Sequence, residues 1–157
     1  MVEQKPKCYK YEDRIEYKIG GPKGKLHRED GPAVEYNGGT KKWYKNGKWH
    51  RENGPAVEYN NGTKFWYING KQHREDGPAV EWNDGDKEWW LNGKQHRENG
   101  PAVEYNDGTK LWCLNDYELN KKEIETFKYL QTVPKSECLL YINTIFKPII
   151  LNRIKNG

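Results

Sequence analysis

The sequence predicts a mainly β fold, an antiparallel meander of β-hairpins with a small C-terminal helical cap. Three observations predict it. Residues 24–115 are four uninterrupted copies of one 23-residue unit, each unit contains two turn dipeptides between short β-rich runs, and the pattern stops after Asn115. A fixed period of this length is typical of a repeat array, in which each unit buries its apolar face against its neighbours.

The repeat divides the chain into three predicted segments. Residues 1–23 form an N-terminal segment whose end, RIEYKIGGPK, reads as a degenerate half repeat with Tyr17 near the position of the repeated tryptophan. Residues 24–115 are the four repeats, and residues 116–157 are the C-terminal cap. Atypical ends are expected of a stacked array, because a bare sheet edge would recruit other chains.

The turn dipeptides predict the strand register. The first loop of each unit is Gly38-Gly39, Asn61-Gly62, Asp84-Gly85 or Asp107-Gly108, and the second is Asn46-Gly47, Asn69-Gly70 or Asn92-Gly93. Both kinds suit a two-residue type I′ turn, which needs positive φ at both central positions. We therefore expect Val57 opposite Trp66, and Trp66 opposite His73.

This register sorts the repeated side chains into two faces, because side chains alternate along a strand. One face is predicted to carry valine, tryptophan, tyrosine and histidine columns: Val34/Val57/Val80/Val103, Trp43/Trp66/Trp89/Trp112, Tyr36/Tyr59/Trp82/Tyr105 and His27/His50/His73/His96. The other is predicted to carry Glu35/Glu58/Glu81/Glu104, Arg28/Arg51/Arg74/Arg97 and the variable Tyr44/Tyr67/Trp90/Cys113. We expect the arginine and glutamate columns to form a cross-strand charge ladder.

The C-terminal segment carries helix signals. Asn120 followed by Glu123 resembles an N-cap with its capping partner, and Ile124, Phe127 and Leu130 follow at helical spacing. A second helix is predicted from Ser136, kinked or divided by Pro148. A strand pair is the alternative, because short apolar runs fit either state.

Composition predicts a thin globular protein that does not bind nucleic acid. Only 34% of residues are hydrophobic, but 7 Trp, 11 Tyr and 3 Phe supply large apolar areas and argue against disorder. The net charge is +4, and the repeats carry equal numbers of basic and acidic residues. We find no basic stripe of the kind that nucleic acid needs.

Three scattered cysteines, Cys8, Cys113 and Cys138, do not form a disulfide framework and favour a reducing compartment. The first residues lack the apolar core of a signal peptide, and the longest apolar runs are too short to span a membrane. We therefore predict a cytoplasmic protein, which means host cytoplasm or virion if the source is viral.

The repeated polar residues are interpreted as structural. Successive histidines of the column His27, His50, His73 and His96 lie two strands apart, roughly 9–10 Å, too far to share one zinc ion. Gly47, Gly70 and Gly93 are read as turn residues. No nucleophile motif, phosphate loop or HExxH is present. The sequence therefore predicts no metal, no cofactor and no enzyme activity.

The recurring WYxNGKxHRExGPAxEYxxGT pattern resembles the MORN repeat in its HREDGPA-type variant. The matching positions include Trp66-Tyr67, Asn69-Gly70, His73, Gly77 and Gly85. The resemblance covers residues 24–115 and departs from the commoner form at Arg74 and Pro78, where that form favours small residues. It implies a hairpin array for protein contact, for scaffolding or, in some members, for membrane phospholipid contact. The variant is familiar in large DNA viruses, phages and bacteria.

These observations predict a non-enzymatic protein-binding or scaffold module that contacts a protein partner or a second copy of itself. The short cap cannot cover the whole predicted valine, tryptophan and tyrosine face, so part of it near the first two repeats is expected to stay available. The candidate partner-binding residues are Trp43, Tyr44, Trp49, Phe65, Trp66, Tyr67 and Trp90. The alternative is a viral or phage accessory protein that sequesters a small anionic ligand or forms part of a particle.

Overall fold

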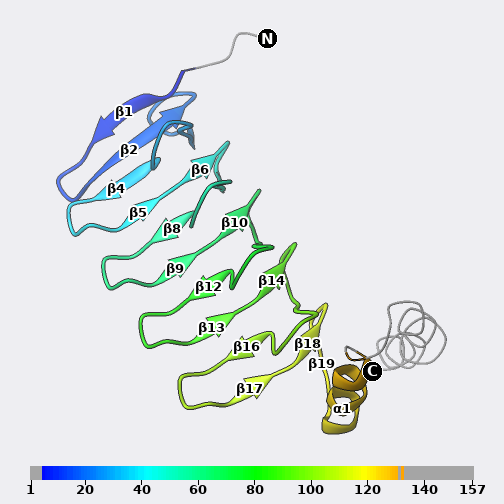
Figure 1. The fold of residues 1–157 in the computed structure, drawn as a ribbon. Helices are drawn as coiled ribbons and strands as arrows, with labels where there is room; N and C mark the ends of the chain where they lie inside the picture. Colours follow the sequence, from blue (N-terminus) through cyan, green and yellow to red (C-terminus); the bar gives the residue numbers. More distant parts are fainter. Residues whose placement is uncertain (1–4, 131, 133–157) are drawn as a thin grey trace.

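The chain folds into a ladder of short antiparallel strands that ends in one helix (Figure 1). The computed structural model describes residues 5–130 and 132. The main sheet contains, in spatial order, β1 (Lys7–Lys10), β2 (Arg14–Ile19), β4 (Val34–Tyr36), β5 (Lys41–Lys42), β8 (Val57–Glu58), β9 (Lys64–Phe65), β12 (Val80–Glu81), β13 (Lys87–Glu88), β16 (Val103–Glu104) and β17 (Lys110–Leu111), with β3 (Lys25–Leu26) beside β2. Every pair is antiparallel, so the predicted meander is confirmed.

A second row of two-stranded hairpins runs along one side of the main sheet (Figure 1). They are β6 (Tyr44–Lys45) with β7 (Lys48–Trp49), β10 (Tyr67–Ile68) with β11 (Lys71–Gln72), β14 (Trp90–Leu91) with β15 (Lys94–Gln95), and β18 (Cys113–Leu114) with β19 (Tyr117–Glu118). A tryptophan separates each hairpin from the main-sheet strand before it, as Trp66 does between β9 and β10. Helix α1 (Lys121–Leu130) follows β19.

The turns of this second row match the prediction. Asn69 and Gly70 both have positive φ, 52° and 82°, as a type I′ turn requires. Ile68 pairs with Lys71 and Tyr67 with Gln72, which is the expected register. The last hairpin closes in the same way through Asn115 and Asp116.

The register predicted for the first turn is wrong by one residue. Val57 pairs with Phe65, not with Trp66. In the loop before β9 only Gly62 has positive φ, and its N–H donates to the carbonyl oxygen of Tyr59 at 3.0 Å. This is a three-residue loop with a glycine bulge. The Asn61 side chain favours it, because its Oδ1 accepts the N–H of Thr63 at 3.0 Å.

A slip of one residue moves a strand's side chains to the opposite face. Val57 therefore shares its face with Phe65, while Trp66 lies on the other side of the sheet. We call the side that carries Tyr36, Tyr59, Trp82 and Tyr105 the tyrosine face, and the side that carries Trp43, Trp66, Trp89 and Trp112 the tryptophan face. The prediction that these two columns share a face is wrong.

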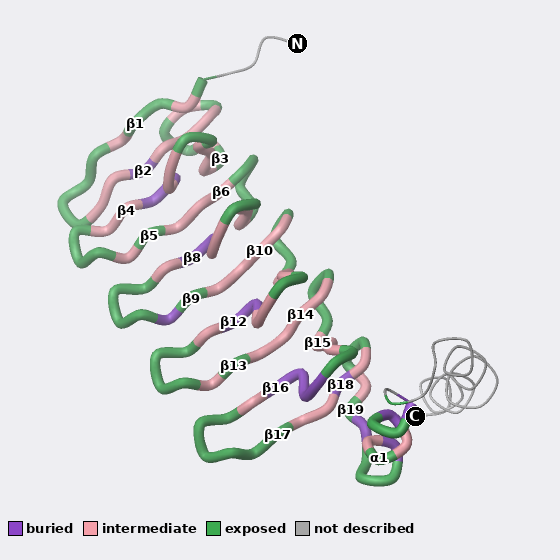
Figure 2. The backbone as a smooth tube through the Cα atoms, in the orientation of Figure 1, coloured by how far each residue is buried: buried purple, intermediate pink, exposed green. Residues whose placement is uncertain are grey.

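The buried centre of each repeat is the alanine and valine of its PAV motif. Ala33, Ala56, Ala79 and Ala102 are fully buried, and Val34, Val57, Val80 and Val103 are at most 3% exposed. Figure 2 shows this buried stretch recurring at β8, β12 and β16. The expectation that part of the valine, tryptophan and tyrosine face stays available is therefore wrong for the valine column, because the array's own side chains cover it.

The helical cap is confirmed as far as residue 130. Asn120 Oδ1 accepts the N–H of Glu123 at 3.1 Å, and Glu123 Oε2 accepts the N–H of Asn120 at 2.9 Å. This reciprocal pair is a capping box. Phe127 of α1 and Leu119 form a small core that also contains Trp112. The predicted second helix from Ser136 lies outside the described residues.

Candidate interaction surface

On the tryptophan face each repeated arginine lies over the aromatic ring of the preceding unit. The Cζ atoms of Arg51, Arg74 and Arg97 lie 3.8–4.2 Å from the ring centroids of Trp43, Trp66 and Trp89. Contacts at this distance are cation–π interactions. Tyr17 occupies the first position of this column, because Arg28 lies 4.0 Å from its ring, as the half-repeat reading predicts.

The same arginines also donate hydrogen bonds to the Gly-Pro corners. Arg74 Nη1 donates to the carbonyl oxygen of Pro78 at 3.2 Å and to Glu81 Oε1 at 3.0 Å. Equivalent arginine–glutamate pairs at 2.7–2.9 Å occur in the other three repeats. A Cβ on Gly77 would lie 2.9 Å from Arg74 Cζ, so any other residue at this corner would displace the arginine. The predicted arginine and glutamate ladder is present in this form.

Lysines extend the ladder across the main sheet. Glu58 pairs with Lys41 on one side and with Lys64 on the other, and Glu81 pairs with Lys64 and Lys87. Opposite charges thus alternate from strand to strand. Cross-strand pairs of this kind contribute roughly 0.2–1 kcal/mol each. The tryptophan face is therefore a charge-balanced surface whose arginines are already paired with glutamates.

The histidines support the turns of the second row. The Nδ1 atoms of His27, His50, His73 and His96 accept the backbone N–H of Asn46, Asn69, Asn92 and Asn115 at 3.0–3.2 Å. An acceptor role for Nδ1 places the imidazole proton on Nε2. Each Nε2 lies 3.5–3.9 Å from a glutamate of its own HRE motif. Among the described residues, no group of three or more histidine, cysteine or acidic side chains is arranged to hold a metal ion.

A hollow of about 550 Å³ lies between the first two repeats on the tryptophan face. Arg28, Trp43, His50 and Arg51 line it together with Glu29 and Glu52. Nη1 of each arginine already donates to a glutamate and to a proline carbonyl. An anionic ligand would therefore bind beside a carboxylate that is already paired with each arginine.

The tyrosine face gathers the positions that differ between repeats. Phe65 lies between Tyr59 and Trp82, with ring centroids 5.8 and 5.2 Å apart in edge-to-face geometry. Trp49 lies 4.8 Å from Tyr67 and 6.1 Å from Tyr44. Such pairs contribute about 0.5–1.5 kcal/mol beyond their buried area. Aromatic contacts thus link the second unit to the third through Phe65 and to the first through Trp49.

Glu88 replaces Phe65 in the third unit and organises the polar part of this face. Its Oε1 accepts the indole N–H of Trp82 at 2.9 Å, and its Oε2 accepts that of Trp90 at 2.9 Å. Gln95 Nε2 adds a third bond at 3.4 Å. In the fourth unit, Cys113 is buried, and burial, followed by the charges of Glu118 and Asp116, raises the pKa of its thiol.

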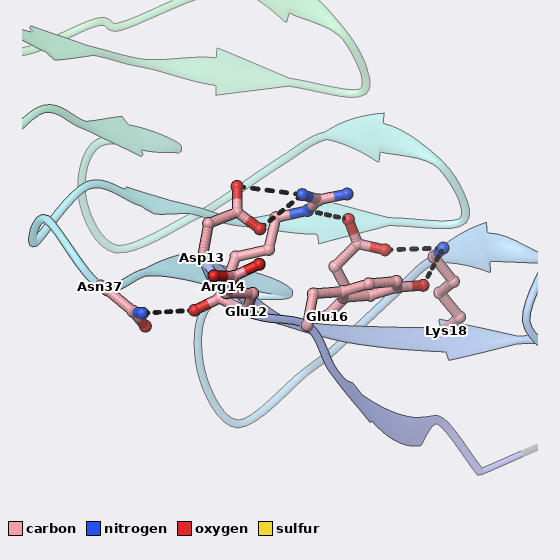
Figure 3. Close-up of polar contacts among 7 residues, drawn as sticks. Glu12, Asp13, Arg14, Glu16, Lys18 and Asn37 are labelled. Atoms are coloured by element: carbon pink, nitrogen blue, oxygen red, sulfur yellow. Dashed lines mark hydrogen bonds and ion pairs between the residues drawn. The ribbon is translucent and has the colours of Figure 1, made fainter.

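At the N-terminal end of the tyrosine face, Glu16 lies between two basic residues (Figure 3). Arg14 Nε and Lys18 Nζ each lie 2.6 Å from one of its carboxylate oxygens. Burial raises the pKa of the Glu16 carboxyl, but these hydrogen bonds outweigh burial and leave that pKa lowered. Nearby, Asn37 Nδ2 donates to the carbonyl oxygen of Glu12 at 2.8 Å, which connects the turn between β1 and β2 to the loop after β4.

Three aromatic side chains of the tyrosine face stay open to solvent although they are large. Tyr59, Trp82 and Tyr105 are each 41% exposed. They recur once per unit, two strands or roughly 10 Å apart. A contiguous exposed apolar patch on a folded protein usually marks an interface.

Comparison of this chain with protein-family models, curated proteins and solved structures found no match. The repeated antiparallel hairpin meander is compatible with MORN-like repeats. In the described part of the chain, no helix combines the length and hydropathy that a membrane crossing requires.

The predicted partner-binding residues fall into two groups. Five of them lie together on the tyrosine face: Tyr44, Trp49, Phe65, Tyr67 and Trp90. Trp43 and Trp66 lie on the opposite face under Arg51 and Arg74. Sequence reasoning did not select Tyr59 and Trp82, which the three-residue loop ending at Gly62 places beside Phe65.

Proposed function

We propose that this chain is a non-enzymatic protein-binding module whose tyrosine face contacts the partner. The proposal rests on one observation. The positions that vary between units lie on the same face as the exposed aromatic side chains. The positions Lys42/Phe65/Glu88/Leu111 differ between units, and they lie beside the exposed Tyr59, Trp82 and Tyr105. Tyrosine and tryptophan are enriched at interfaces, where they contribute much of the binding energy.

The opposite face supports the same assignment by contrast. Its tryptophans are covered by arginines, and its arginines are paired with glutamates in every unit. Repetition of one arrangement in each unit indicates an architectural role. The resemblance of the repeat to the MORN family, in which hairpin arrays serve protein contact and scaffolding, favours the same function.

The test is affinity capture from native cells with matched variants. Tyr59→Ala combined with Trp82→Ala should abolish the captured partner, while Lys45→Ala combined with Glu75→Ala, two exposed residues outside the tyrosine face, should retain it. Circular dichroism of both pairs confirms folding. Equal capture by all folded forms, or loss only with the Lys45 and Glu75 pair, would reject the tyrosine face as the binding surface.

A further inference from the structure

One row of side chains on the tyrosine face has opposite charges on either side of an aromatic residue. Lys42 of β5, Phe65 of β9 and Glu88 of β13 occupy equivalent positions in three successive units, each opposite a buried valine. The strand order β5-β8-β9-β12-β13 places two strand spacings between neighbours in this row. Lys42 and Glu88 are therefore equally far from Phe65, roughly 10 Å.

We propose that the tyrosine face binds a second copy of this chain, with the two ladders antiparallel and a twofold axis between the two Phe65 side chains. The inference rests on the proposed function, because it names the partner of that same face. A twofold axis that runs along the strands reverses the order of the units and keeps each row facing itself. It brings Lys42 of one copy opposite Glu88 of the other, twice.

The neighbouring rows are compatible with this arrangement. Tyr59 precedes Phe65 by one strand and Trp82 follows it by one strand, so they face each other across the axis. Tyr44 and Trp90, one unit before and after Tyr67, become opposite in the same way. Each copy thus sets aromatic side chains against aromatic side chains, as interface centres commonly do.

Other positions of the twofold axis produce unfavourable charge contacts between the two copies. An axis through Lys42 would set two lysines against each other, and an axis through Glu88 would set two carboxylates against each other. An axis midway between Phe65 and Glu88 would place that carboxylate on an aromatic ring. Like charges at an interface cost several kcal/mol, so the charges select the axis at Phe65.

Both charged groups have bonding capacity left for a partner. Within the described residues, Lys42 lies over the Tyr36 and Tyr59 rings at 5.1 and 5.9 Å and forms no ion pair. The Glu88 carboxylate accepts three hydrogen bonds and offers roughly four acceptor sites. A hollow of about 510 Å³ beside Lys42, lined by Tyr36 and Tyr59, gives room for side chains of the second copy.

The surface is also large enough. The eight strands from β4 to β17 span about 34 Å, and the six residues from Thr63 to Ile68 span about 20 Å across them. The product is on the order of 700 Å² per copy, close to the ~800 Å² that a standard interface buries on each partner. Two twisted sheets can pack face to face in this way, with their strands about 30° apart.

Charge reversal tests the pairing by sedimentation velocity over micromolar to submillimolar concentrations. The unaltered chain should dimerise, and Lys42→Glu or Glu88→Lys alone should weaken the dimer about tenfold or more, because each sets like charges opposite each other twice. The double variant should regain the original affinity. Monomers at every concentration, or a double variant no tighter than either single variant, would overturn the proposal.

Chemical cross-linking tests the axis independently of charge. In a chain with Cys8→Ser and Cys138→Ser, a short bis-maleimide reagent should join Phe65→Cys into a covalent dimer, because the two positions face each other at the axis across a sheet spacing of about 10 Å, which is too long for a direct disulfide. Leu111→Cys, in the same row but far from the axis, should stay monomeric. Cross-linking through position 111 and not through position 65 would overturn the antiparallel arrangement.

The two proposals fail in different ways. A chain that stays monomeric, yet captures another protein through Tyr59 and Trp82, would remove the second copy as the partner and leave the proposed function intact. A chain that neither dimerises nor captures a protein in a manner that depends on these residues would remove both.

Discussion

The Nζ atom of Lys128 lies 5.1 Å from the ring centroid of Trp112, over the same ring position that an arginine takes in the earlier units. The fourth unit has no following HRE motif to supply that arginine. Helix α1 supplies a cation instead, together with Phe127, whose ring centroid lies 6.2 Å from that of Trp112. The helix thus replaces a fifth unit on the tryptophan face.

The arginine contacts predict a measurable loss on truncation. Arg74→Ala removes the cation–π contact with Trp66, the bond to Pro78 and the ion pair with Glu81. We expect the free energy of unfolding to fall by about 2 kcal/mol, mostly from the lost contact with Trp66, because a partly exposed ion pair contributes little. Urea denaturation measures it. Arg74→Lys keeps the charge without the planar group, so its free energy of unfolding should lie between those of the unaltered protein and Arg74→Ala.

The Gly-Pro corner predicts a contrast between two glycines whose φ is not positive. Gly77→Ala places a Cβ 2.9 Å from Arg74 Cζ, whereas Gly38→Ala places one 3.9 Å from its nearest neighbour, Asn60 Nδ2. We expect the first to destabilise the protein by about 1–3 kcal/mol. The second should be neutral or stabilise it by up to about 1 kcal/mol, by restricting the unfolded chain. Thermal unfolding of both variants tests this contrast. Similar losses of stability in the two variants would contradict the predicted clash at Gly77.

The role of Nδ1 in the histidines predicts that asparagine is a better replacement than leucine. His73→Leu leaves the N–H of Asn92 without its acceptor, while the Oδ1 of His73→Asn can take the place of Nδ1. We expect the free energy of unfolding to fall by about 1 kcal/mol for the leucine variant, because the exposed N–H can donate to water instead. The fall should be smaller for the asparagine variant. Hydrogen exchange at the amide of Asn92 provides the readout, which should accelerate in the leucine variant alone.

The capping box predicts how loss of the Asn120 side chain affects helix α1. Asn120→Ala removes the acceptor of the Glu123 N–H and should cost about 1 kcal/mol of helix stability. The fluorescence of Trp112, which packs on this small core, should shift toward that of exposed tryptophan. Thr126→Ala serves as the control. It removes a solvent-exposed hydrogen bond from the Thr126 hydroxyl to the carbonyl oxygen of Lys122 in the same helix and should leave the spectrum unchanged.

The Glu16 cluster predicts acid sensitivity at the N-terminal end. Because the folded pKa of Glu16 is lowered, its contribution is present above the unfolded value of about 4.3 and is lost as pH falls through the folded pKa. Glu16→Gln should therefore flatten the stability profile below about pH 4.5. Denaturation of both forms across this range measures the difference. Parallel profiles would show that Arg14 and Lys18 do not hold this carboxylate in solution.

Sequence reasoning reached the meander, the second-row turns, the Tyr17 position and the capping box, because each depends on local chemistry. It failed at Asn61-Gly62, where a two-residue and a three-residue loop share the same dipeptide. The bond from the Thr63 N–H to Asn61 Oδ1 favours the three-residue loop, but the first unit forms the same loop with Gly38 at that position, so the dipeptide alone does not decide the register. The error reversed the faces, so Trp43 and Trp66 were grouped with surface residues although arginines cover them.

The arginine that covers the preceding ring makes this protein resemble a polymer with distinct end groups. Tyr17 starts the column and Lys128 terminates it, and each unit between them both receives a cation and supplies one. Whole 23-residue units can in principle be removed or duplicated without disturbing either end. Length, and with it the number of aromatic side chains that a partner meets, is therefore adjustable in steps of one unit.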